Sequence, residues 1–310
     1  NQNLLTGVLD LTEGAIGKRP VAVMVNNVDP AMPQYGVGKA DIIFEIPVEG
    51  DATRFMALYG DYTAVPKICA IRSCRAYFPA LSEGFDAFYV NWGSDDTIGE
   101  YIASLNLDQI DGISDGSGLF GRDQARLSAG YDLEHTGYFD GTQFASVVQS
   151  RGLRTDIEED KKDAAFSFYG LNEQVKPDGE DCQKVDINFG AARATLTYDE
   201  AKKVYVKDLN GKPQIDGNTG EQLAFTNVFV LETSITVRDE IGHKEVDWDG
   251  ASDSVGYYIS NGGVQKIHWS KEEKNEQSRL KFYDQNGKEI KINRGKSYIA
   301  VNYADQATFQ

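Results

Sequence analysis

The chain has 310 residues, of which 41% are hydrophobic and 25% charged, and its formal net charge is −17. This composition is typical of a globular protein with a core, and the length suits two domains. The negative charge argues against a general nucleic-acid binder and against a binder of anionic membrane surfaces, because both need a basic patch. No apolar run reaches the roughly 18 residues of a membrane-spanning helix.

Three strands are predicted in the first sixty residues. Residues 19–27 and 54–59 are mostly apolar. In 41–49 the apolar side chains at even positions form a core face, and the other face carries carboxylates that include Glu45 and Glu49. That second face is expected to meet arginines.

Residues 68–71 read as a buried strand that ends at Arg72. Ser73 is the predicted N-cap of an amphipathic helix over 76–88, so Arg72 and Arg75 would flank a helix start. Backbone N–H groups there already carry partial positive charge, and two further cations make sense if an anion lies among them. With Arg54 from the preceding strand, these residues form the predicted anionic-ligand site. The alternative reading is an internal ion-pair network in which the arginines and Glu45 and Glu49 neutralise one another.

The rest of the first half alternates strands and helices. A strand is predicted at 87–92, a helix at 95–105 with Ser94 as its cap, and a helix at 142–151 with a cap near Asp140. This alternation predicts an α/β layered domain with a mixed sheet over 15–165.

The composition changes after this domain. A charge run at 156–163 and a polar linker at 170–183 precede a series of short strands joined by tight turns, including the Asn-Gly turns at 261–262 and 286–287. We therefore predict a β-rich antiparallel C-terminal domain over 184–306, a sandwich or open barrel, which makes the chain α+β overall.

His135 is the candidate general base, oriented by Asp123 or Glu134, and either His135 or Arg122 is expected to close the pocket around the arginines. A nucleophile would have to be Ser73, Ser94 or Cys74, and no known signature surrounds any of them. Glu45 and Glu49 lie about 13 Å apart along a strand, which is too far for a glycosidase pair. No metal-ligand or cofactor-binding pattern occurs, so we expect neither metal nor cofactor.

Cysteine spacing gives no zinc or redox motif. Cys69, Cys74 and Cys182 are expected to be buried thiols. A disulfide between Cys69 and Cys74 stays open, although it would have to bring two Cα atoms within about 7 Å across a strand and a turn.

Motifs over most of the chain carry a family resemblance. They include Arg19-Pro-Val-Ala-Val-Met-Val-Asn-Asn27, Thr53-Arg-Phe55, Arg72-Ser-Cys-Arg75, Phe120-Gly-Arg-Asp123 with His135, Trp269-Ser-Lys271 and Phe282-Tyr-Asp-Gln-Asn-Gly-Lys-Glu-Ile290. Together they resemble the YerB-like lipoprotein family, a bacterial family of uncharacterised function that is common in Firmicutes. Cys74 stands where the family motif has alanine.

The resemblance implies an exported protein on the outer face of the cytoplasmic membrane, held by a lipidated N-terminal cysteine that this chain lacks. Because the chain starts at Asn1 without Met, we expect a trimmed mature segment. The resemblance implies no established activity. We therefore expect a non-enzymatic binding or scaffold protein whose partner is an anionic small molecule, an envelope polymer or another protein. The alternatives are a hydrolase or transferase that acts on cell-wall material with a His base, and a purely structural protein.

Overall fold

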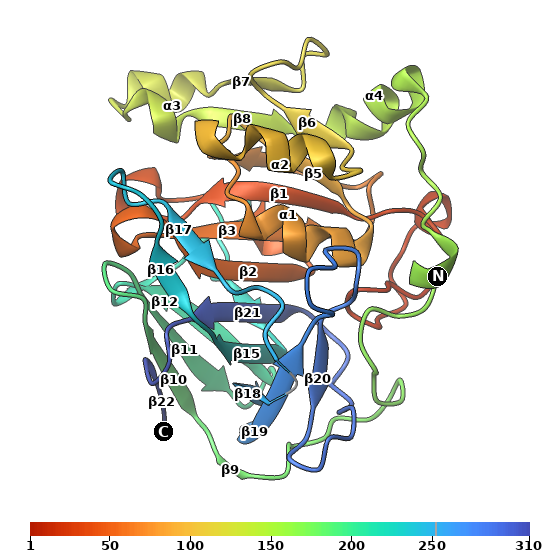
Figure 1. Ribbon diagram of the computed structural model, residues 1–310, viewed down its shortest axis with the longest axis vertical. Helices are drawn as coiled ribbons and strands as arrows, with labels where there is room; N and C mark the ends of the chain where they lie inside the picture. Colours follow the sequence, from red (N-terminus) through yellow and green to blue (C-terminus); the bar gives the residue numbers. More distant parts are fainter. Residues whose placement is uncertain (252) are drawn as a thin grey trace.

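The computed structural model describes residues 1–251 and 253–310, and one sheet of eleven strands runs through both halves of the chain (Figure 1). From edge to edge its strands are β20 (Lys281–Tyr283), β19 (Gly263–Ser270), β18 (Ser254–Ser260), β15 (Asn227–Glu232), β21 (Ser297–Asn302), β2 (Ile42–Pro47), β3 (Thr53–Tyr59), β1 (Val21–Asn26), β5 (Phe88–Asn91) and β6 (Gln109–Asp111), with β9 (Glu180–Asp181) paired to β19.

The two halves of the chain meet inside this sheet. Strand β21 pairs in parallel with β2, from Ile42 opposite Ser297 to Glu45 opposite Ala300. Strand β1 pairs antiparallel with β3 and parallel with β5, so the sheet is mixed, as predicted. The sheet therefore continues from the predicted N-terminal α/β segment into the predicted β-rich segment.

Smaller sheets flank the large one. A six-stranded antiparallel sheet contains β13 (Lys212–Pro213), β12 (Val204–Leu209), β11 (Arg193–Asp199), β10 (Lys184–Asn188), β22 (Ala307–Phe309) and β14 (Ala224–Phe225). Strands β4 (Lys67–Cys69), β8 (Gly137–Asp140) and β7 (Phe120–Arg122) form a third sheet, and β16 (Ile235–Val237) with β17 (Lys244–Val246) forms a separate hairpin. The β-rich, antiparallel character predicted for the second half is confirmed.

Both faces of the large sheet are covered. Val23 and Phe55 on one face share a core with Leu196 and Tyr205 of the six-stranded sheet. The neighbouring residues along the same strands point to the other face, where they pack with Phe78 of helix α1. The α-helices are α1 (Tyr77–Ser82), α2 (Gly99–Ser104), α3 (Gln124–Ser128) and α4 (Phe144–Arg151). The 3-10 turns are η1 (Glu13–Ala15), η2 (Asp29–Ala31), η3 (Val37–Lys39), η4 (Glu49–Asp51), η5 (Glu83–Phe85), η6 (Asp96–Ile98), η7 (Leu133–His135), η8 (Gly141–Gln143) and η9 (Glu159–Lys161).

Two predicted helix caps are wrong. Helix α1 starts at Tyr77 after Ala76, which gives no side-chain cap, because the Ser73 hydroxyl lies further back and accepts a hydrogen bond from Arg75 instead. In the next segment Asp95, not Ser94, is the cap, and its Oδ1 accepts the Thr97 N–H at 2.9 Å. The cap near Asp140 is confirmed, since its carboxylate accepts the Thr142 N–H at 3.2 Å.

Within the described residues, no helix combines the length and the apolar character needed to cross a membrane. All three cysteines are free and buried, so the described part of the chain contains no disulfide. Burial raises the pKa of Cys69 to about 11 and that of Cys74 to about 12.

Candidate anion-binding cleft

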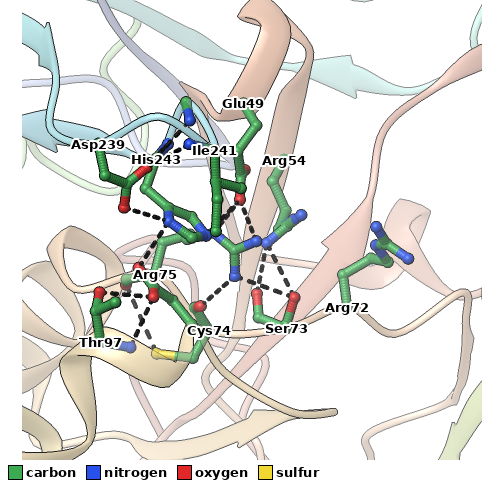
Figure 2. A network of polar contacts seen from close by, with 12 residues as sticks. Glu49, Arg54, Arg72, Ser73, Cys74, Arg75, Thr97, Asp239, Ile241 and His243 are labelled. Atoms are coloured by element: carbon green, nitrogen blue, oxygen red, sulfur yellow. Dashed lines mark hydrogen bonds and ion pairs between the residues drawn. The ribbon is translucent and has the colours of Figure 1, made fainter.

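A cleft of about 180 Å³ opens beside the ends of β1 and β4, at the turn between β2 and β3. It holds all three arginines of the predicted site. Its lining consists of Asn26, Val28, Val48, Glu49, Ala52, Thr53, Arg54, Arg72, Arg75, Glu134 and His135. Figure 2 shows the side chains of Arg54 and Arg75 converging on Ser73, whereas the Arg72 side chain points away from them.

Arg75 is the most fully paired of the three arginines. Its Nε donates to Glu49 Oε1 at 2.7 Å, and its Nη2 contacts the same oxygen. Its Nη1 donates to the Ser73 hydroxyl at 3.1 Å and to the Cys74 carbonyl at 2.7 Å. Burial by itself would raise the pKa of Glu49, but the Arg75 contacts outweigh it and lower the pKa. Glu49 thus stays ionised and already neutralises Arg75.

Arg72 is partly paired. Its Nη1 donates to Glu134 Oε2 at 2.7 Å, and this hydrogen bond lowers the pKa of Glu134. The Glu134 side chain is 54% exposed, so this ion pair is screened by water. The Nε of Arg72 is buried and has no hydrogen-bond partner in the described part of the chain.

Arg54 is the least paired arginine, although it is only 4% exposed. Its Nη1 donates to the Ser73 carbonyl at 2.7 Å, and the Ser73 hydroxyl lies 3.5 Å away. Among the described residues no carboxylate forms an ion pair with it, since Glu49 pairs with Arg75 and Glu134 with Arg72. Burial lowers the pKa of Arg54 to about 10, the charges of Arg75 and Arg72 act in the same direction, and the charge of Glu49 opposes them only in part. A buried cation without a counter-ion is costly, so this guanidinium stands out from the rest of the cleft.

Glu45 does not belong to this cluster, contrary to the prediction. In the β2–β3 ladder Glu45 lies opposite Phe55, whereas Ile46 lies opposite Arg54, so Glu45 and Arg54 point to opposite faces of the sheet. Glu49 reaches the arginines because it lies past the end of β2, in η4, where strand alternation no longer applies.

Arg122 and Asp123 also lie outside the cleft, which corrects their predicted role. The Arg122 guanidinium stacks 4.3 Å from the Trp92 ring centroid and donates to the Leu133 carbonyl at 2.7 Å. Asp123 caps helix α3 by accepting the Arg126 N–H at 3.0 Å, and it pairs with Lys67 at 3.1 Å. Both side chains are engaged by neighbours that do not line the cleft.

His135 does line the cleft. Its Nδ1 accepts from the Asn26 side-chain nitrogen at 2.9 Å, which leaves the ring proton on Nε2, and Nε2 lies 3.7 Å from a Glu134 oxygen. Burial lowers the pKa of His135, so the ring is neutral at pH 7. Among the described residues, no hydroxyl or thiol group forms a hydrogen bond with either ring nitrogen of His135. The Ser73 hydroxyl bonds to Arg75 and the Cys74 thiol to Tyr89, so the geometry pairs His135 with no nucleophile.

The hairpin β16–β17 brings residues to the cleft that the sequence analysis did not find. His243 Nε2 lies 3.4 Å from Glu49, and its Nδ1 lies 2.6 Å from Asp239 and 3.6 Å from Asp95 (Figure 2). Arg238 also pairs with Asp95. These residues come from distant segments without a shared motif, so only the fold places them together. In the described residues, no group of three His, Cys, Asp or Glu side chains is arranged to hold a metal ion.

Comparison with known proteins identifies the family. Residues 5–154 match the model described as "Protein of unknown function (DUF3048) N-terminal domain", and residues 185–299 match the corresponding C-terminal domain. "Putative lipoprotein YerB" of Bacillus subtilis (strain 168) is 29% identical over 270 residues, which cover 86% of this chain and 76% of that protein. The chain belongs to the YerB-like family.

The fold of this YerB-like chain matches a solved structure as well. The crystal structure of YerB protein from Bacillus subtilis superposes with a TM-score of 0.83 at 25% identity and covers 100% of this chain and 99% of that chain. The resemblance read from the motifs is therefore confirmed over both halves. The descriptions of the two matched domains assign no activity.

Proposed function

We propose that this YerB-like chain is a cell-envelope lipoprotein, held at the outer face of the cytoplasmic membrane, that binds an anionic group in its arginine cleft. The lipoprotein name of its relative supports the location. The binding role rests on one observation: Arg54 is buried at the cleft, and no carboxylate among the described residues pairs with it.

A carboxylate or phosphate group would complete this arrangement. An oxyanion beside Arg54 would accept charge-assisted hydrogen bonds from its guanidinium and lie near Arg72 and Arg75. The internal ion-pair reading explains Arg75 with Glu49 and Arg72 with Glu134, but it leaves the charge of Arg54 without a partner. Glu49 acts on Arg54 only through its charge, because its carboxylate is bonded to Arg75, and an external anion would supply the missing direct partner.

Sulfate titration tests the proposal. At a hundredfold excess over its dissociation constant, sulfate should stabilise the wild type by about 2.7 kcal/mol against unfolding. Arg54→Met should abolish this effect, because it removes the unpaired cation and keeps much of the side-chain volume. Arg193→Met is the matched control, since Arg193 is an exposed arginine of strand β11. Equal stabilisation of the wild type and Arg54→Met would show that sulfate does not bind in the cleft.

Sulfate affinity should also rise as the pH falls from about 7.5 to about 5. Protonation of His135 adds a cation to the cleft, and a charge close to the anion in a partly solvated site is worth about 1 kcal/mol, or roughly fivefold in affinity. Glu49 and Glu134 stay ionised in this range because their pKa values are lowered. Sulfate is a suitable probe because its charge is constant there.

Without sulfate, the stability of the folded protein should fall, not rise, as the pH falls. Burial lowers the pKa of His135 in the folded state, so His135 contributes stability above its unfolded pKa, and this contribution is lost as the pH falls below about 6.5. His135→Asn should remove the pH dependence of sulfate binding. The same pH dependence in His135→Asn would assign it to another group of the cleft.

A further inference from the structure

Exposed apolar side chains gather around the mouth of the cleft. Seven large apolar residues of the described chain are strongly exposed, and four of them are Ile113, Leu133, Val237 and Ile241. Single exposed apolar residues are ordinary on protein surfaces, but several around one polar cleft mark an interaction site. We call these four residues the apolar rim.

Sequence position and contacts place Leu133, Ile113 and Ile241 beside the cleft, and Val237 lies on the same hairpin as Ile241. Leu133, 59% exposed, directly precedes Glu134 and His135 in η7. Ile113, 72% exposed, packs at Gly93, where an added Cβ atom would lie 3.7 Å from Ile113 and 4.0 Å from Ser73.

Val237 and Ile241 lie on the β16–β17 hairpin, Val237 at the end of β16 and Ile241 in the turn. Ile241 is 73% exposed and lies in the turn that the Asp239 carboxylate closes by accepting the N–H groups of Ile241 and His243, each at 3.1 Å (Figure 2). His243 in turn contacts Glu49 of the cleft. In the view of Figure 2, Ile241 is drawn next to His243 and Glu49.

The size of the cleft limits what can fill it. Its volume of about 180 Å³ is below the roughly 300–1,000 Å³ of pockets that enclose a whole small ligand. A carboxylate-sized group fits, and the remainder of its carrier would lie on the rim. An arginine anchor surrounded by apolar side chains is the composition of the centre of a protein–protein interface.

Building on the proposed anion site, we infer that the natural ligand is a protein segment that inserts an Asp or Glu side chain into the cleft and packs flanking apolar side chains on the rim. The net charge of the chain favours binding of an acidic segment at the cleft over binding elsewhere on the surface. At a net charge of −17, most of the surface repels an acidic segment, so the cleft would fix its position and register. The same repulsion disfavours a second copy of this chain as the occupant.

Short acetylated and amidated peptides with a central glutamate test this inference by fluorescence anisotropy. One peptide has leucine on both sides of the glutamate, and its partner has serine. The leucine peptide should bind the wild type at least about tenfold more tightly, because burying even one such side chain is worth about 1.5 kcal/mol or more. Leu133→Ser/Ile241→Ser should reduce this preference to near unity, whereas Ile16→Ser/Leu171→Ser, which removes exposed apolar residues outside the rim, should retain it. Sulfate titration of each variant reports whether the cleft is intact.

The results that would contradict the protein-segment inference differ from those that would contradict the proposed function. If sulfate binds but both peptides bind equally, the protein-segment inference is wrong and the anion site stands. If neither sulfate nor any peptide binds, the proposed function is wrong as well. Binding to phosphatidylglycerol vesicles that is lost in Leu133→Ser/Ile241→Ser would assign the rim to a lipid surface. Dimerisation in sedimentation that the same variant abolishes would assign it to a second copy. Either result overturns the inference.

Discussion

Replacing Lys207 by methionine should lower the free energy of unfolding by about 3–5 kcal/mol, because it leaves a buried carboxylate without its counter-ion. Lys207 of β12 lies 3.3 Å from Glu45 of β2, and both side chains are fully buried. The Glu45 carboxylate also accepts from Asn27, Thr53 and Tyr298 at 2.6 to 2.9 Å. Hydrogen bonds to neutral donors do not replace the lost positive charge.

Urea unfolding of three variants measures this effect. Glu45→Gln/Lys207→Met should recover most of the loss, since it removes both charges together. Lys202→Met is the matched control, because Lys202 lies in the same sheet region with its side chain 75% exposed, and it should change stability by less than about 0.5 kcal/mol. If Lys207→Met is no less stable than the wild type, Glu45 is not an uncompensated anion and the interpretation of this pair is wrong.

Arg126→Ala should have the second large effect, a loss of about 3–5 kcal/mol. The Arg126 guanidinium is buried and donates to the carbonyls of Ala31 at 2.8 Å and His135 at 2.9 Å, and it also contacts the Pro33 carbonyl. It stacks on the rings of Tyr35 and Tyr131, 4.4 and 4.9 Å from their centroids. Alanine would leave these carbonyls without a hydrogen-bond donor and would leave a cavity between the rings.

The same substitution should weaken sulfate binding, because Arg126 holds the backbone of His135, which lines the cleft. Thermal unfolding and sulfate titration together test both effects. Arg193, whose side chain is 61% exposed, provides the control substitution Arg193→Ala, expected to change stability by no more than about 1 kcal/mol because Asp186 keeps its ion pair with Lys184. Wild-type stability in Arg126→Ala would contradict a structural role for this guanidinium.

Local patterns were sufficient to predict much of the fold. Apolar runs located β1, β3 and β5, and the Asn-Gly turn at 261–262 located the β18–β19 hairpin. The cap residues Ser73 and Ser94 were predicted wrongly because an N-cap depends on where the helix begins, which tertiary packing decides here. The pairing of β2 with β21 was not predictable, since each strand by itself is only a buried apolar run.

The residues of the candidate site were also predicted only in part. Arg54, Arg72, Arg75 and Glu49 were found from sequence because strand ends and turns bring them together over a short stretch of chain. Glu45 was wrongly grouped with Glu49 because the alternation rule was extended past the end of β2, where Glu49 has already left the strand. The contribution of His243 depends on a hairpin from the other half of the chain, and no local pattern reports such a contact.

The most direct test of the anion site is the unfolding free energy of Arg54→Met, with and without sulfate. Burial lowers the pKa of Arg54 to about 10, so its charged form in the folded protein costs on the order of 3 kcal/mol, offset in part by its bond to the Ser73 carbonyl. We expect Arg54→Met to be as stable as the wild type, or up to about 2 kcal/mol more stable, and insensitive to sulfate. A loss of more than about 2 kcal/mol with an unchanged response to sulfate would show that Arg54 holds the fold together and binds no anion.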